Sequence, residues 1–200
     1  MPRPKSFVPE EVLDKAMVLF WQKGFEATSV QDLVDHMGIN RFSLYSTFGD
    51  KQRLFLSALD RYRDQVTLAA IRTLEEPDGG LDAIRRFFES LIQFHCTQQE
   101  PVRGCLMVNT AVELAPHSDT VSIKVQAHRE LLEGELLRQL TVARQRGEIA
   151  ADSNLAGLAT YLTTSIFGLA VLAKSSPAPG ALEAFGRTVL AALDHTPVEA

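Results

Sequence analysis

One strip of the chain, residues 38–51 (GINRFSLYSTFGDK), constrains the fold more than any other segment. Gly38 and Gly49 mark two turns and leave room for a helix of only about two or three turns between them. A helix that short is marginal alone, and its surface is rich in side chains that bind phosphates or base edges rather than a core. We therefore expect the partner of this surface to be a DNA groove.

The segment before this strip predicts a second short helix. Thr28 or Ser29 is a suitable N-cap, and Gly38 is a suitable C-cap because glycine tolerates positive φ. Asn40 can cap the helix that follows. Within the helix between Ser29 and Gly38, the apolar residues recur at helical spacing, at Val30, Leu33, Val34 and Met37. A helix, a short turn containing glycine and another helix form the helix-turn-helix signature.

The rest of the chain completes an all-α fold. An apolar stripe at Val12, Ala16, Leu19 and Phe20 predicts a first helix over residues 9–24, so residues 1–50 form a three-helix DNA-binding domain. Residues 51–200 predict a bundle of about six helices without a competing strand pattern. The expected helices span residues 51–74, 80–98, 104–114, 118–145, 152–174 and 181–194, with Asp152 or Ser153 starting the fifth of them.

The sequence resembles the TetR family of bacterial transcriptional regulators. The resemblance lies in residues 25–54 (FEATSVQDLVDHMGINRFSLYSTFGDKQRL), and residues 103–121 (RGCLMVNTAVELAPHSDTV) are similar to the ligand domain of one subgroup. It implies an N-terminal reading domain and a C-terminal domain for ligand binding and dimerisation. It also implies that the helix beginning at Lys51 swings when a ligand binds. The chain departs from the family pattern at Ser46, where a second aromatic residue or histidine is usual.

The helix-turn-helix assigns individual contacts. Arg41 and Phe42 open the third helix, where an arginine can read guanine and an aromatic ring can contact a thymine methyl group. Lys51 stands in the first turn of the next helix, where its charge opposes the helix dipole, so a phosphate partner is expected. The alternative is that Arg41 and Lys51 are solvated surface charges that do not contact DNA. The candidate DNA-binding residues are Thr28, Ser29, Asn40, Arg41, Phe42, Ser43, Tyr45, Ser46, Thr47 and Lys51.

The charge balance limits how such a domain can bind DNA. The chain carries a formal net charge of −5, and residues 1–50 hold five basic and seven acidic residues. Binding must then rely on a local patch, with the acids pointing away from the phosphates. The expected patch comprises Arg3 and Lys5 on the N-terminal arm with Arg41, Lys51 and Arg53. This balance disfavours promiscuous nucleic-acid binding and favours a dimer placed on a palindromic operator in double-stranded DNA.

Composition suits a packed soluble protein, with 46% hydrophobic and 22% charged residues. No membrane span and no signal peptide is expected, so the predicted location is the cytoplasm, where cysteines are reduced. The last two expected helices are apolar on more than one side, which predicts a homodimer interface; the alternative is a three-layer core within one protomer. The interface residues predicted are Leu158, Leu162, Ile166, Leu169, Phe185 and Val189.

The middle of the chain supplies material for an effector pocket. Apolar and polar side chains of three expected helices, Phe87, Phe88, Leu91, Phe94, His95, Met107, Val108 and His128, are the candidate lining for a small molecule. The alternative is that most of them are plain core residues. We expect no cofactor.

Cys105 is a candidate thiol switch. It is expected in the first turn of a helix and follows Arg103, and both features lower a thiol pKa. The resemblance of residues 103–121 agrees, since relatives with a cysteine there include thiol-switched regulators. Cys96 is a candidate resolving partner, and the alternative is a buried, inert Cys105. A metal site from His95, Cys96, Cys105 and His117 lacks compact spacing, so no metal is assigned.

The sequence therefore predicts a homodimeric DNA-binding transcriptional regulator, a repressor released from its operator by a small-molecule ligand. The alternative is a redox- or electrophile-sensing repressor switched through Cys105. An all-helical enzyme is a remote alternative, because no nucleophile elbow, paired metal-binding histidines or phosphate-binding glycine loop is visible. A protein-interaction module is equally remote.

Overall fold

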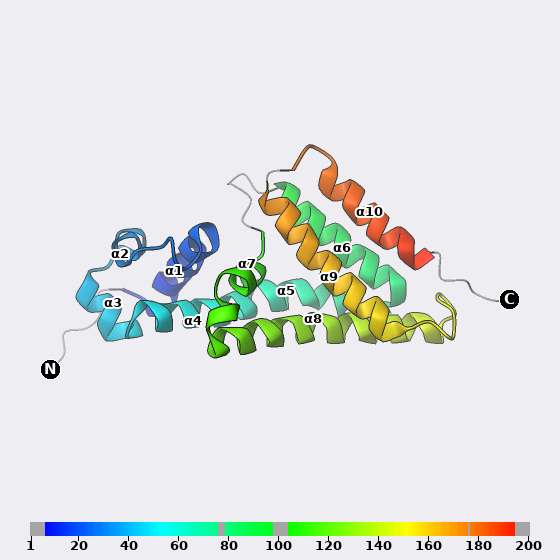
Figure 1. Ribbon diagram of the computed structural model, residues 1–200, viewed down its shortest axis with the longest axis horizontal. Helices are drawn as coiled ribbons and strands as arrows, with labels where there is room; N and C mark the ends of the chain where they lie inside the picture. The colour runs from blue at the N-terminus through cyan, green and yellow to red at the C-terminus, as the bar shows by residue number, and fades with distance from the viewer. Residues whose placement is uncertain (1–6, 76–78, 98–103, 176, 195–200) are drawn as a thin grey trace.

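The computed structural model describes residues 7–75, 79–97, 104–175 and 177–194, and the regular secondary structure in these ranges is all helical, as predicted (Figure 1). Three helices, α1, α2 and α3, gather at one end of an elongated molecule. The helices α6, α8, α9 and α10 form the other end, and α7 lies between the two. The bounds are α1 Pro9–Lys23, α2 Val30–Met37, α3 Arg41–Phe48, α6 Gly80–Thr97, α7 Leu106–Glu113, α8 Asp119–Gln145, α9 Leu155–Lys174 and α10 Ala181–Asp194.

One rod connects the two ends of the molecule (Figure 1). It begins with α4 (Lys51–Tyr62), passes through a π-helical turn, η1 (Arg63–Thr67), and continues as α5 (Leu68–Ile71). A 3-10 turn, η2 (Arg72–Leu74), ends it, so the predicted extent of 51–74 is confirmed. The π-helical turn was not predicted. Such turns occur mostly as local insertions in α-helices, frequently at functional sites.

Each end of the molecule has its own main hydrophobic core. The N-terminal core is built on Phe20, Leu33, Leu44 and Phe55, and Leu106 and Met107 of α7 are part of it. The second core lies among α6, α8, α9 and α10. The predicted domain boundary at residue 50 remains a prediction, and the participation of α7 in the N-terminal core was not foreseen.

The start of α9 differs from the prediction. Asn154 is the N-cap, because its side-chain oxygen accepts a hydrogen bond from the Gly157 amide at 3.0 Å. Neither Asp152 nor Ser153 takes this position. The helix is also long and apolar enough to cross a membrane by length and composition, contrary to the expectation from the sequence, and less than half of its most apolar window is buried within the chain. A core helix of a soluble protein passes the same test.

Gln139 joins the end of the rod to the start of α6. Its side chain is fully buried, its Oε1 accepts a hydrogen bond from the Gly80 amide at 2.8 Å, and its Nε2 donates to the Leu74 carbonyl oxygen. Glu148 supports the same corner by accepting from the Leu81 amide at 2.8 Å. One buried amide therefore satisfies backbone groups on both sides of the interruption between the rod and α6.

We predict that Gln139→Leu lowers the free energy of unfolding by about 1–3 kcal/mol, because the buried Gly80 amide loses its acceptor, whereas the Leu74 carbonyl keeps the hydrogen bond from Arg138. Urea denaturation at one fixed protein concentration measures this, since dimerisation would make stability depend on concentration. The control is Gln126→Leu, an exposed position on the same helix α8. Equal stabilities of the two variants would contradict the assigned role of Gln139.

Candidate DNA-binding surface and central cavity

The turn before α2 is organised by Ser29. Its Oγ accepts a hydrogen bond from the Asp32 amide at 3.0 Å, and the Asp32 carboxylate accepts from the Ser29 amide at 2.9 Å, which completes a capping box. Hydrogen bonds from Ser29 and from Lys23 lower the pKa of Asp32. The Lys23 ammonium lies 2.9 Å from Asp32. Ser29 is exposed, so the cap leaves it at the surface.

The turn and cap of α3 match the sequence prediction. Gly38 ends α2 in the left-handed region, at φ 70° and ψ 33°. The Asn40 side chain accepts from the Ser43 amide at 2.8 Å and so caps α3. Leu44 is fully buried, whereas Phe42 is 81% exposed and Tyr45 is 46% exposed. The Phe42 ring therefore projects almost fully into solvent beside the capped start of α3.

Two cations stand beside this surface in different settings. The Arg41 guanidinium donates to the Gln31 side-chain oxygen at 3.2 Å, across the turn between α2 and α3. The Lys51 ammonium lies 4.1 Å from the centroid of the Phe25 ring, a cation–π contact that the sequence did not suggest. Arg3 and Lys5 lie outside the described residues.

Two of the predicted phosphate ligands have hydroxyl groups that do not face outward. Thr28 is fully buried, and its Oγ1 donates to the Gly24 carbonyl oxygen at 2.5 Å. The Thr47 hydroxyl is buried and has no hydrogen-bond partner among the described residues. Ser46 is exposed, and its Oγ donates to the Ser43 carbonyl oxygen at 3.2 Å. The Thr28 side chain therefore supports the loop, and its contact with a phosphate remains a prediction.

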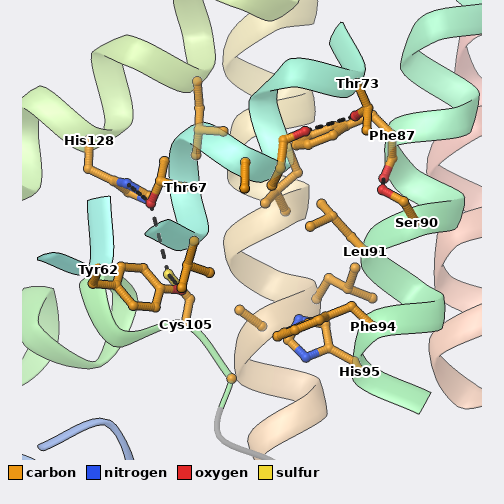
Figure 2. Close-up of a pocket in the computed structure, with 18 of the residues that line it drawn as sticks. Tyr62, Thr67, Thr73, Phe87, Ser90, Leu91, Phe94, His95, Cys105 and His128 are labelled. Atoms are coloured by element: carbon orange, nitrogen blue, oxygen red, sulfur yellow. Dashed lines mark hydrogen bonds between the residues drawn. The ribbon is translucent and has the colours of Figure 1, made fainter. Parts of the chain in front are cut away.

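A cavity of about 420 Å³ lies in the C-terminal half, beside the rod (Figure 2). The rod contributes residues from Tyr62 to Thr73, and α6, α8 and α9 supply the other walls. The described lining is mostly apolar and comprises Tyr62, Gln65, Val66, Thr67, Ala69, Ala70, Thr73, Phe87, Ser90, Leu91, Phe94, His95, Gly104, Cys105, His128, Leu132, Ile166, Leu169 and Ala170.

The structure brings together five of the eight residues predicted for the pocket. Those that line the cavity are Phe87, Leu91, Phe94, His95 and His128. The other three do not. Phe88 is fully buried in the second core, Met107 belongs to the N-terminal core, and Val108 lines a separate hollow beside Lys23 and Glu113.

The sequence reasoning missed the contribution of the rod to the cavity. The π-helical turn η1 places Gln65, Val66 and Thr67 on the cavity wall. The one available signal was the continuous apolar face of the helix predicted for residues 51–74. Which part of that face would be covered by other helices is decided by tertiary packing, which a single helix pattern does not contain.

Polar groups cluster at one side of the cavity (Figure 2). The Tyr62 hydroxyl donates to Cys105 Sγ at 3.4 Å, and Thr67 Oγ1 lies 3.4 Å from His128 Nδ1. His128 Nε2 is 4.0 Å from Cys105 Sγ. Burial lowers the pKa of His128 to about 4, so the ring is neutral near pH 7. This cluster is therefore uncharged and internally hydrogen-bonded.

The expected low pKa of Cys105 is wrong. Burial raises the pKa of this thiol, and the hydrogen bond from Tyr62 only partly opposes that effect. Arg103, the expected cation, lies outside the described residues. Cys105 is the N-cap of α7, but no side-chain capping bond forms there. The thiol is thus held in its protonated form near pH 7.

Cys96 does not share the environment of Cys105. It is exposed, both cysteines are free, and Cys96 Sγ lies 3.5 Å from a carboxylate oxygen of Glu183 on α10. Partial burial and the Glu183 carboxylate raise the Cys96 pKa. Within the described ranges, no group of three or more His, Cys, Asp or Glu side chains is arranged to hold a metal ion.

The residues predicted for the dimer interface face mainly inward. Leu162, Ile166, Leu169 and Val189 are each at most 9% exposed within the single chain, and all four pack in its hydrophobic cores. Leu158 and Phe185 are only partly buried. The prediction of outward-facing apolar residues is therefore wrong for these four. The outer face of α9 instead exposes Gly157, Thr160, Tyr161, Thr164, Gly168 and Val171.

Family profiles and curated relatives match both the N-terminal and the C-terminal part of this chain. The family profile "Bacterial regulatory proteins, tetR family" matches residues 12–58, and "Tetracyclin repressor-like, C-terminal domain" matches residues 80–189. The HTH-type regulator YezE of Bacillus subtilis (strain 168) is 35% identical over 87% of this chain and 90% of its own length. The HTH-type transcriptional repressor ComR of Escherichia coli (strain K12) is 33% identical over 86% of this chain and 82% of its own.

A solved structure extends the likeness to the whole chain. It holds a cysteine mutant of the TetR-family transcriptional regulator CifR in complex with a 26-bp double-stranded operator DNA. It is 30% identical to this chain, covers 98% of it and 100% of its own chain, and superposes with a TM-score of 0.82. With both family profiles and two relatives in agreement, this chain belongs to the TetR family of bacterial transcriptional regulators, which are DNA-binding proteins and not enzymes.

Proposed function

We propose that this regulator is a homodimeric repressor that leaves its operator when a small molecule enters the central cavity. The observation that carries the DNA-binding part is the surface of α3, where Phe42 stands almost fully exposed beside Arg41 behind an Asn40 cap. The operator complex of CifR and the repressor function in the name of ComR support the same assignment. Its place of action is then the cytoplasm.

The outer face of α9 supports the homodimer. Gly157, Thr164 and Gly168 are small, exposed and spaced at about one or two helical turns, so a second helix can approach closely. Tyr161 and Val171 add apolar area to the same helix, at 39% and 55% exposure. A twofold copy of this face would cover α9 and would place two reading helices about 34–36 Å apart.

The rod supports coupling between the cavity and the DNA-reading surface, which is the exposed side of α3 around Arg41 and Phe42 (the reading surface). Its middle segment, η1, lines the cavity, and its first residue, Lys51, lies on the Phe25 ring next to the turn before α2. A ligand that binds one arrangement of the rod better than another shifts the population of the two. The π-helical turn offers such a second arrangement, because it can convert to α-helix by a shift of one residue.

A thiol switch at Cys105 is the second candidate function. It is favoured by one observation, the position of Cys105 on the cavity wall, where an electrophile bound in the cavity would meet the sulfur. It is opposed by the raised pKa of the thiol. Reaction would require transfer of the thiol proton, and the neutral His128 ring at 4.0 Å is the acceptor in reach.

We predict that Arg41→Ala weakens specific operator binding by about 1–3 kcal/mol and relaxes the preference at one base pair. Phe42→Ala should act in the same direction through lost contact with a thymine methyl group. Gel shifts over a range of salt concentrations, on the DNA that flanks the gene, measure both. Arg129→Ala, at an exposed position on α8, is the matched control. The absence of a specific complex with the unaltered protein at any low salt would refute the proposed function.

We predict that Cys105 reacts with iodoacetamide at pH 7 roughly tenfold more slowly than a free cysteine, because burial keeps it protonated. Mass spectrometry of digested protein measures the modification of each cysteine over time, with Cys96→Ser as the background and unfolded protein as the reference. The reaction rate should rise with pH across the alkaline range. A rate for Cys105 above that of the unfolded reference would instead revive the thiol switch.

A further inference from the structure

We propose that the central cavity takes a small, uncharged and mostly apolar molecule that carries a hydrogen-bonding group at its His95 end. This inference rests on the effector role proposed above. It concerns the chemistry of the ligand, which can be tested without DNA.

The described part of the cavity lining offers no charged partner for an ionic group. None of its described lining residues is Asp, Glu, Lys or Arg. Both histidines in the lining are neutral near pH 7, since burial lowers the pKa of His95 as well as that of His128. An ion transferred from water into such a site would lose its hydration without compensation. Carboxylate and ammonium ligands are therefore disfavoured.

His95 is a buried polar group of the lining that is left over for a ligand, whereas the Gln65 amide faces Asp14 and Arg61. His95 is 8% exposed, lines the cavity, and makes no hydrogen bond to any described residue. The hydroxyl hydrogens of Thr73 and Ser90 are used, since each donates at 2.8 Å to a carbonyl oxygen of its own helix. Tyr62, Thr67, Cys105 and His128 contact one another on a different side of the cavity (Figure 2). A neutral imidazole can donate at one nitrogen and accept at the other.

The walls favour a ring in the apolar part of the ligand. Phe87 and Phe94 line the cavity together with aliphatic side chains such as Leu91 and Leu132. Aromatic side chains pack with other rings in edge-to-face or offset stacked geometry. A volume of about 420 Å³ lies at the lower end of the range for small-molecule sites. A compact molecule with one ring and a short polar arm fits this description.

The chain contains its own reporter of occupancy. Trp21 is the single tryptophan, and it is buried in α1 against two residues that line the cavity. Its ring centroid is 4.9 Å from that of Tyr62 and 6.4 Å from that of Phe94. Its Nε1 donates to the carbonyl oxygen of Gly104, which also lines the cavity, at 3.2 Å. A ligand that displaces these groups should change the tryptophan emission.

The test uses a matched pair of probes, 4-phenylbutanol and 4-phenylbutanoate, with the full-length protein and no DNA. Calorimetry and Trp21 emission measure binding. We expect the alcohol to bind at least about a hundredfold more tightly than the carboxylate. Equal binding, tighter binding of the carboxylate, or no binding of either probe would overturn the proposed ligand class. Release of operator DNA is measured separately, so binding without release would refute the effector role and leave the ligand class standing.

Two variants test whether the probe binds inside the cavity. His95→Phe keeps an aromatic ring at this position but removes the hydrogen-bonding group, and it should weaken the binding of the alcohol about tenfold. Ala69→Phe fills space at an exposed position of the cavity wall and should abolish binding. The controls are His117→Phe and Ala127→Phe, at exposed positions that do not line the cavity. A control that weakens binding as much as its partner would contradict the proposed site.

A separate observation concerns Glu113, at the end of α7. Its Oε2 accepts a hydrogen bond from the Phe25 amide at 3.0 Å, and its Oε1 accepts from the Glu26 amide at 2.8 Å. Both amides belong to the loop between α1 and α2. Gly24 opens this loop at φ 84°, and a Cβ there would lie 2.9 Å from Glu113 Oε2. The loop backbone therefore rests directly on this carboxylate.

The opposite end of α7 meets the cavity. Cys105 is the N-cap of α7, and Gly104 and Cys105 both line the cavity wall. The intervening residues Leu106 and Met107 are buried in the N-terminal core. A single helix of eight residues thus joins the cavity to the loop that sets the start of α2.

We infer that α7 is a second link between the cavity and the reading surface, parallel to the rod, and that Glu113 is its positioning residue for DNA binding. Glu113 holds the loop in which Thr28 is anchored on Gly24 and from which Ser29 caps α2. Movement of Gly104 and Cys105 by a ligand would shift this carboxylate and release the loop. The inference rests on the DNA-binding function but not on the ligand class.

Glu113→Gln tests this link, because it replaces one of the two acceptor oxygens with an NH₂ donor, and the backbone amide that faces this group loses its acceptor. We expect specific operator affinity to fall about tenfold and hydrogen exchange at Phe25 and Glu26 to accelerate. The control Glu89→Gln, exposed on α6, removes the same charge. Loss of a negative charge alone would strengthen DNA binding, so a decrease cannot arise from net charge.

The exchange rates of the Phe25 and Glu26 amides and the operator affinity together test the positioning role of Glu113. Faster exchange at the two amides with unchanged operator affinity would show that the contact does not position the loop for DNA. Unchanged exchange would show that Glu113 does not hold the amides. If Glu113→Gln unfolds the chain, Glu113→Asp provides the second variant; it keeps both acceptors but shortens the arm, and an affinity equal to that of the unaltered protein would also overturn the inference.

Discussion

The N-terminal core closes only because residues from outside the three-helix unit enter it. Two of the three helices, α2 and α3, have eight residues each, which is too short for independent stability. Phe55 of α4 packs edge-to-face on Phe20, with ring centroids 4.9 Å apart, and Leu106 and Met107 arrive from α7. The reading surface is therefore stabilised by the same helices that form the cavity wall. A change in one has a direct mechanical route to the other.

Aromatic residues at this junction belong both to the packing of the N-terminal core and to the surroundings of the cavity. Trp21 belongs to the N-terminal core, yet its ring neighbours Tyr62 and Phe94 line the cavity. Tyr62 in turn stands at the end of α4, directly before the π-helical turn. These ring contacts thus span the boundary between the N-terminal core and the cavity. Close-packed interiors transmit displacements because they have no free volume to absorb them.

The parts that could be predicted from sequence are those fixed by local chemistry. The caps at Ser29, Gly38 and Asn40 follow from short-range hydrogen bonds and backbone freedom, and all three are confirmed. The pKa of Cys105 could not be predicted, because burial by distant segments outweighs its position at a helix start. The orientation of Leu162 and Leu169 was equally inaccessible. A helix that is apolar all round gives no periodic signal to separate its inner face from its outer face.

The chain has a net negative charge, so its DNA binding depends on where its basic side chains lie and not on an excess of them. Several basic side chains are already paired with acids, among them Lys23 with Asp32 and Arg61 with Asp14. Arg41 differs, because its guanidinium donates to the neutral side chain of Gln31 and no described acid pairs with it. Its charge therefore remains available at the start of the reading helix. Few uncompensated cations imply few released counterions, so specificity in this protein must come mainly from base contacts.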